Sequence, residues 1–141
     1  MPGNILVPAA VLVMWTLVML LWMASARGPA LGKLGPGQLK SGARGQDLEG
    51  LIDDRVNWKA HNYVHLHEQP TVFYAAVLIL ALSGYGKADV LLAWIYVVLR
   101  VLHSIWQASL NRQPVRMVLF LLSSLALIAL GTRTLLATLG N

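Results

Sequence analysis

The sequence from residue 5 to residue 26, ILVPAAVLVMWTLVMLLWMASA, is apolar almost throughout and contains no charged side chain. A helix needs roughly 20 residues to cross the hydrocarbon core of a bilayer, and this stretch is long enough. It is too long for the apolar region of a signal peptide, and Met1 to Asn4 carry no positive side chain. We therefore expect it to remain as a membrane span.

Three further stretches follow this first one, at residues 47–83, 89–110 and 115–139. The early part of the second, Asp47–Trp58, has apolar residues on one helical face and reads as an amphipathic lead-in. No stretch alternates strictly between polar and apolar residues, which argues against a membrane barrel. The pattern predicts an all-α, four-helix membrane bundle that forms a single domain over residues 1–141.

The connection between the first two predicted helices, residues 27–46, has a different composition. Seven of the twelve glycines lie between Arg27 and Gly50, together with Pro29 and Pro36. Glycine and proline at this density favour loops over helices. We expect a flexible polar loop here.

The overall composition supports a membrane protein and excludes several other classes. Hydrophobic residues make up 57% of the 141 residues and charged residues 12%, against about 25% charged in soluble domains. The net charge of +5 is not arranged as a basic run with interleaved aromatic residues, so we expect no nucleic-acid partner. The chain has no cysteine, which excludes disulfides and a cysteine nucleophile.

The positive charges are distributed unevenly between the two sides of the predicted bundle. Only Lys87 and Arg133 lie on the side of the termini. The other side, with the long first loop and the short turn between the third and fourth predicted helices, carries Arg27, Lys33, Lys40, Arg44, Arg55, Lys59, Arg112 and Arg116. The positive-inside rule then places loops 27–58 and 111–114 in the cytoplasm and both termini on the opposite side.

Two clusters of polar residues lie at membrane depth, where ionisable groups are expensive and often functional. Each cluster has helical spacing and shares one face of its helix. The clusters are His61, His65 and Glu68 on the second helix, and Arg100, His103 and Gln107 on the third. Glu68 and Arg100 fall at similar depth, so we predict that they form an ion pair. Such a pair could serve binding, or it could only lock the two helices together.

Two other features of these clusters bear on the site. Pro70 should kink the second helix near Leu66 and leave a backbone carbonyl free beside the polar residues. His61, His65, Glu68 and His103 are also residue types that bind metals. Membrane di-iron enzymes carry several histidine boxes of this kind and this chain has one, so we expect no metal.

Two stretches of the chain resemble a known superfamily. Residues 100–116, RVLHSIWQASLNRQPVR, resemble the junction of the third and fourth helices in the membrane-associated proteins in eicosanoid and glutathione metabolism (MAPEG). The spacing is most similar to that of the microsomal prostaglandin E synthases. Residues 61–74, HNYVHLHEQPTVFY, resemble the second helix of bacterial members. The four-helix layout with a long first loop is also similar.

The resemblance implies a fold, a cofactor and roles for particular residues. Members of the superfamily are four-helix bundles that form homotrimers and bind glutathione between subunits, near the cytoplasmic face. Arg116 matches the catalytic arginine that stabilises the glutathione thiolate. Glu68 matches the glutamate that holds the glutathione amino group, and His103 matches a histidine of that pocket. Arg100 and Arg112 match basic residues around it.

Other positions depart from the pattern of the superfamily. With Glu68 aligned, His61 occupies a position that is usually arginine, and His65 occupies one that is usually asparagine. Asn62 could replace that asparagine only if the register shifts. Gln107 stands in place of a tyrosine, and Met117 follows Arg116 where the prostaglandin synthases have serine. We include His61, Asn62, His65 and Gln107 among the expected cofactor-binding residues.

Two functions remain open at this stage. The first is a glutathione-dependent transferase or peroxidase that acts on lipophilic substrates. The second is a non-catalytic scaffold or lipid-binding trimer, for example an accessory subunit of a larger membrane complex. In both cases we expect a homotrimer in contact with membrane lipids.

Overall fold

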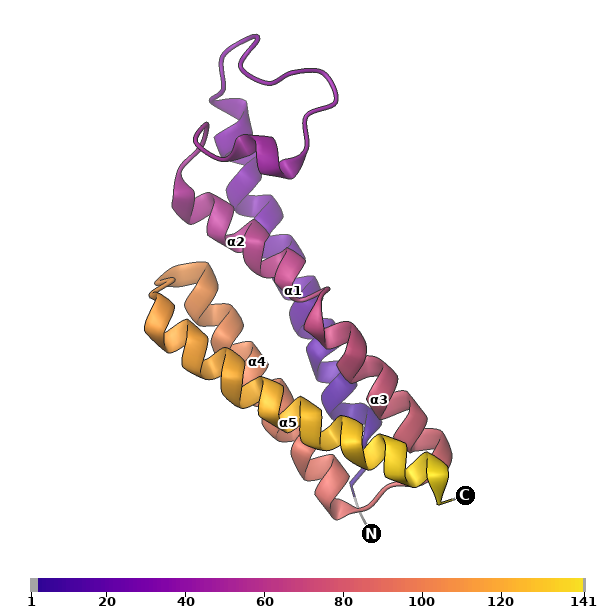
Figure 1. Ribbon diagram of the computed structural model, residues 1–141. Coiled ribbons are helices and arrows are strands. Elements are labelled where there is room, and N and C mark those ends of the chain that lie inside the picture. The colour runs from indigo at the N-terminus through magenta and orange to yellow at the C-terminus, as the bar shows by residue number, and fades with distance from the viewer. Residues whose placement is uncertain (1–2, 141) are drawn as a thin grey trace.

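The computed structural model describes residues 3–140, and in that part of the chain every regular element is a helix. Four helical segments are long and apolar enough to cross a membrane, which confirms the predicted integral, multi-pass architecture. Figure 1 shows both termini at one end of the bundle and the long loop after the first helix at the other end.

The first helix, α1 (Leu6–Gly32), is longer than predicted. It continues six residues past Ala26 and includes Pro29, although we expected the polar loop to begin at Arg27. The loop that follows contains a short 3-10 helix, η1 (Gly45–Leu48). Leu48 is 4% exposed and fixes this short helix against the bundle.

The second predicted helix, 47–83, is divided into two. Helix α2 (Asp54–His65) is separated from helix α3 (Gln69–Ser83) by three residues outside both helices. The predicted continuous lead-in from Asp47 is wrong, because Gly50 has φ of +78° and the chain turns between η1 and α2. Asp53 then starts α2 by accepting a hydrogen bond from the backbone N–H of Arg55 at 2.7 Å.

The last two helices, α4 (Lys87–Ser109) and α5 (Gln113–Leu139), lie within two residues of their predicted bounds. Gly84, with φ of +102°, ends α3, as expected for a residue without Cβ. Asp89 lies in the first turn of α4, where its carboxylate accepts from the Gly86 N–H at 2.7 Å. Asn111, with φ of +50°, forms the tight turn into α5.

The core of the bundle is apolar and lies between α1, α3, α4 and α5. Leu12, Phe73, Val77 and Tyr96 are at most 1% exposed, and the Phe73 and Tyr96 rings stack with centroids 4.5 Å apart. Outside this core the helices present large apolar side chains, with Leu82 at 90% exposure. An outward surface of this kind is compatible with lipid and not with water.

Candidate functional site

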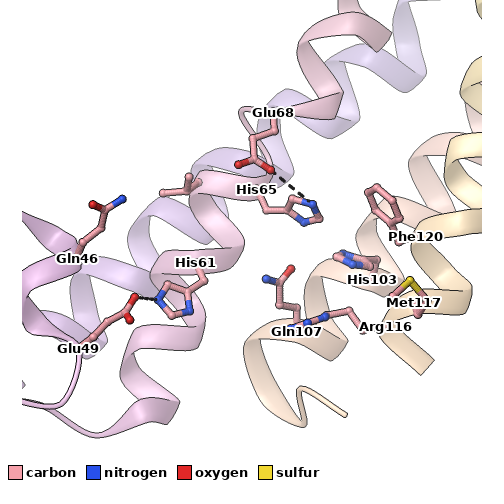
Figure 2. A pocket seen from close by; sticks show the side chains of 11 residues that line it. Gln46, Glu49, His61, His65, Glu68, His103, Gln107, Arg116, Met117 and Phe120 are labelled. Carbon is pink, nitrogen blue, oxygen red and sulfur yellow. Dashed lines mark hydrogen bonds and ion pairs between the residues drawn. The ribbon is translucent and has the colours of Figure 1, made fainter. Parts of the chain in front are cut away.

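A cavity of about 480 Å³ lies between α2 on one side and the paired helices α4 and α5 on the other. It is near the end of the bundle that carries the long loop. Its walls mix charged, imidazole, amide and apolar groups, and Figure 2 shows these side chains facing one another across it. The lining residues are Gln46, Glu49, His61, Val64, His65, Glu68, His103, Gln107, Arg116, Met117 and Phe120.

The break between α2 and α3 shapes one side of the cavity. Pro70 lies in the first turn of α3, and Glu68, with φ of −87° and ψ of −94°, is outside the helical conformation. The predicted kink near Leu66 is therefore confirmed, in the form of a complete interruption. The His65 carbonyl accepts a hydrogen bond from the Glu68 backbone N–H at 3.4 Å, in a turn and not in an α-helix, and a second one from Arg100 Nη2 at 3.0 Å.

The predicted ion pair between Glu68 and Arg100 is wrong. Arg100 is 1% exposed, whereas the Glu68 side chain is 62% exposed and lies 3.6 Å from His65 Nε2. The prediction assumed one continuous helix, in which Glu68 would follow His61 and His65 along the inner face. The interruption at Leu66 turns Glu68 outward, and a backbone carbonyl takes its place beside Arg100.

Three rings from three helices meet at the cavity wall. The His65 ring lies 5.1 Å from the His103 ring and 5.7 Å from the Phe120 ring, with which it is nearly parallel at 24°. The Arg100 guanidinium lies behind these rings, with its central carbon 5.8 Å from the Phe120 centroid. The buried arginine therefore adds positive charge close to the wall without lining it.

Arg116 reaches the cavity from the first turn of α5. Its Nη1 donates to the Asn111 side-chain oxygen at 2.6 Å, so the left-handed turn residue also orients the guanidinium. No ion pair among residues 3–140 includes Arg116. The arginine therefore presents a positive charge that a neutral amide positions but does not neutralise.

The rim opposite Arg116 includes two residues that the sequence analysis did not identify, Gln46 and Glu49. Glu49 Oε1 lies 2.9 Å from His61 Nε2, which joins the loop to α2. This segment is held further by Asn57 Nδ2, which donates to the Leu48 carbonyl at 3.3 Å. The amphipathic pattern of Asp47–Trp58 indicated a continuous helix and could not place these residues, because the chain turns at Gly50.

The structure brings six of the nine predicted site residues together at the cavity: His61, His65, Glu68, His103, Gln107 and Arg116. The other three lie elsewhere. Asn62 is 1% exposed and donates to the Ser104 hydroxyl at 2.6 Å. Arg112 precedes α5, and its carbonyl accepts from the Trp106 ring N–H at 3.0 Å. Arg100 is behind the wall.

Several buried polar atoms beside the cavity have no hydrogen-bond partner within residues 3–140. They are Asn62 Oδ1, His65 Nδ1, Arg100 Nε and Nη1, and Gln107 Oε1. Unpaired buried polar groups are rare and are usually satisfied by bound water or by a ligand. The residues that would bind a metal do not converge, since within the described chain no three histidines, aspartates or glutamates form a possible metal site.

Comparison with known proteins gives one match. The model of the MAPEG family matches residues 5–136, which include the first three membrane-spanning segments, the fourth up to residue 136, and every residue of the cavity. No curated protein and no solved structure matches the chain. On the extent of the family match, the chain belongs to the MAPEG family.

Proposed function

We propose that the protein is a glutathione-dependent membrane enzyme that transfers the thiol to lipophilic electrophiles or uses it to reduce lipophilic peroxides. The observation that carries this proposal is Arg116, a cavity-lining arginine with an amide partner and no carboxylate partner in the described chain. A guanidinium in this setting favours the charged form of a neighbouring thiol. The MAPEG family generally involves glutathione, which makes it the expected thiol.

The two carboxylates at the rim suit the other end of glutathione. Glu49 and Glu68 are 60% and 62% exposed, and both line the cavity. A carboxylate attracts an ammonium group, so these residues are suited to holding the amino group of the tripeptide. His61, His65, His103 and Gln107 provide further hydrogen-bonding groups along the wall.

The apolar part of the lining suits the second substrate. Val64, Met117 and Phe120 contribute to the same cavity as Arg116, and Val64 and Met117 are about half exposed. In a transfer reaction, the thiolate would form a bond to an electrophilic carbon while the bond from that carbon to its leaving group breaks. Arg116 would hold the thiolate in position for this attack.

The proposal includes finer assignments that follow the family resemblance. These are a homotrimer whose neighbouring subunits complete the glutathione site, a relationship to the prostaglandin E synthase branch, and a cytoplasmic position for the long loop and the turn into α5. The concentration of basic residues on that side supports the last assignment.

A non-catalytic scaffold or lipid-binding trimer is the second candidate, and one observation favours it. The family's asparagine position is occupied by His65, and Asn62 cannot replace it because its side chain is buried against Ser104. The set of residues that would surround glutathione therefore differs from that of the family. A protein of this kind would keep the bundle and lose tripeptide binding.

The deciding experiment measures thermal stability with and without reduced glutathione in the detergent-purified parent, Arg116→Ala and Arg55→Ala. Arg55 is exposed and outside the cavity, so its variant is a matched control. Glutathione at about 100 times its dissociation constant should add about 2.7 kcal/mol to the parent and to Arg55→Ala. Arg116→Ala should show a smaller gain and no turnover of model electrophiles. No gain in any form would favour the scaffold.

A further inference from the structure

A second cavity, of about 410 Å³, lies on the other side of α2 from the candidate site. Helix α1 contributes Met23 and Arg27, the segment before η1 contributes Arg44, and α2 contributes Tyr63 and Val64. Among residues 3–140, its lining contains two arginines and no acidic residue. We refer to it as the Arg27–Arg44 cavity.

Neither arginine of this cavity has a carboxylate partner among residues 3–140. Arg27 Nη2 donates to two neutral oxygens, the Gly45 carbonyl at 3.0 Å and Asn57 Oδ1 at 3.3 Å. Arg27 Nε is buried and has no hydrogen-bond partner in the part of the chain that the structure describes. A positive charge that is fixed by neutral groups and retains an unpaired donor is suited to an anion that comes from outside the chain.

The chain makes room for the Arg27 guanidinium. A Cβ at Gly45 would lie 2.8 Å from Arg27 Nη1, closer than real Cβ contacts, so the absence of a side chain there permits this approach. Arg27 thus crosses from α1 to the loop and fixes the segment that carries Arg44. These contacts fix the Arg27 guanidinium, and the exposed Arg44 lines the same cavity.

The depth of the cavity in the membrane is indicated by its neighbours. Lys59 Nζ lies 5.3 Å from the centre of the Trp22 ring, and tryptophan with lysine is typical of the membrane–water interface. Arg27 follows Trp22 by five residues, about 7 Å farther along α1. The two arginines therefore lie at the level of lipid headgroups.

The remainder of the wall is apolar. Met23, Ala60 and Val64 line the cavity with the arginines, and Val64 is about half exposed to the surroundings. A ligand at this site would thus meet positive charge at one end and hydrocarbon at the other. This combination matches a phospholipid, whose phosphate and acyl chains are arranged in the same order along the membrane normal.

We propose that the Arg27–Arg44 cavity binds the phosphate group of an anionic phospholipid. Arginine forms paired, charge-assisted hydrogen bonds to phosphate oxygens, and the absence of an acidic lining residue disfavours headgroups that carry their own cation. Anionic lipids are concentrated in the cytoplasmic leaflet, the side to which the basic residues assign this end of the bundle.

Lipid at this position would also stabilise the candidate site. Gln46, His61 and Val64 line both cavities, and Glu49 is joined to His61 at 2.9 Å. A phosphate held by Arg44 would restrain the segment that forms one rim of the larger cavity. The proposal does not depend on glutathione, since lipid binding can be measured without it.

The test uses delipidated protein in detergent and three probes: phosphatidylglycerol, phosphatidylcholine and inorganic phosphate. Native mass spectrometry counts bound lipid, and thermal unfolding measures stabilisation. Phosphatidylglycerol should bind and stabilise the parent in preference to phosphatidylcholine. Each removed charge, in Arg27→Gln or Arg44→Gln, should weaken apparent affinity about fivefold. Arg55→Gln, an arginine outside the cavity, should behave as the parent.

Arg44→Gln keeps the experiment decisive if Arg27→Gln does not fold, because Arg44 is exposed and its backbone N–H, not its side chain, bonds to Asp47 at 2.6 Å. Unchanged preference for phosphatidylglycerol in Arg44→Gln would overturn the proposal, as would equal binding of both lipids by the parent. Stabilisation by inorganic phosphate equal to that by phosphatidylglycerol would show that the site takes a free phosphate compound and not a lipid.

Discussion

Helix α4 carries two buried charged residues, Asp89 near one end and Arg100 about 16 Å farther along. Asp89 is bonded to Arg133 through both of its carboxylate oxygens, and it also accepts from the Gly86 N–H. Arg100 makes one hydrogen bond, to the His65 carbonyl, and its Nε and Nη1 have no partner within the described residues. The same helix therefore carries one buried charged group with a full set of hydrogen-bond partners and one with unpaired donors within the described residues.

The difference separates the part of the molecule that maintains the fold from the part that is available for binding. The satisfied group is at the end with the termini, whereas the unsatisfied groups of α2 and α4 lie beside the larger cavity. Unpaired polar groups lower stability, so their concentration at one place indicates that a ligand or solvent completes them. Three substitutions test this distinction.

The largest effect is expected at the satisfied end. Arg133→Met removes the partner of Asp89, whose side chain is 4% exposed, and leaves a buried carboxylate with only the Gly86 N–H. Breaking a fully buried pair typically removes 3–5 kcal/mol; because Arg133 is 45% exposed, we expect about 2 kcal/mol. Chemical denaturation in mixed micelles measures the loss. A loss under about 0.5 kcal/mol would contradict the structural role of this pair.

An intermediate effect is expected at Ser104, which is fully buried next to the cavity. Its hydroxyl accepts from the Trp15 ring N–H at 2.9 Å and from Asn62 Nδ2 at 2.6 Å, so it joins α1, α2 and α4. Hydrogen bonds between membrane helices average about 0.6 kcal/mol, so Ser104→Ala should lose about 1 kcal/mol. Ser109→Ala is the control, since that hydroxyl bonds only to its own helix. Equal stability of the two variants would show that the Ser104 hydroxyl does not hold the three helices together.

The smallest effect on stability is expected at Arg100, despite its burial. Arg100→Met keeps a long side chain and loses one hydrogen bond, but it also removes a buried charge that has no carboxylate partner among residues 3–140. Replacing such a group by an apolar one is often close to neutral. We expect the ligand-free stability to change by less than about 0.5 kcal/mol. A loss as large as that of Arg133→Met would show that the two buried charges are structurally equivalent, contrary to the comparison.

The sequence predicted the membrane architecture well because that architecture depends on composition and length. The apolar runs located α4 and α5 within two residues, and Pro70 located the interruption of the second span. His61, His65, His103 and Gln107, which helical spacing grouped on the faces of two helices, line one cavity. Local pattern was sufficient wherever the helix itself determines the position of a side chain.

The remaining features depend on contacts between distant parts of the chain. The predicted pairing of Glu68 with Arg100 was wrong because the depth of Glu68 was calculated along an unbroken helix. Three non-helical residues interrupt that helix and turn Glu68 away from Arg100. Glu49 and Gln46 reach the cavity only because Leu48 and Asn57 fix the loop. Contacts of this kind leave no periodic signal in the sequence, so they could not have been predicted from it.

Helix α1 has 27 residues and extends about 40 Å, whereas the hydrocarbon core of a typical bilayer is about 30 Å thick. The helix must therefore tilt within the bilayer, or roughly 10 Å of its length must extend beyond the hydrocarbon. Bilayer thickness then determines how much of the Arg27 end lies in the headgroup layer. The acyl-chain length of the lipid should therefore affect both cavities. Reconstitution in short-chain and long-chain lipids would place their mouths at different heights relative to the membrane surface.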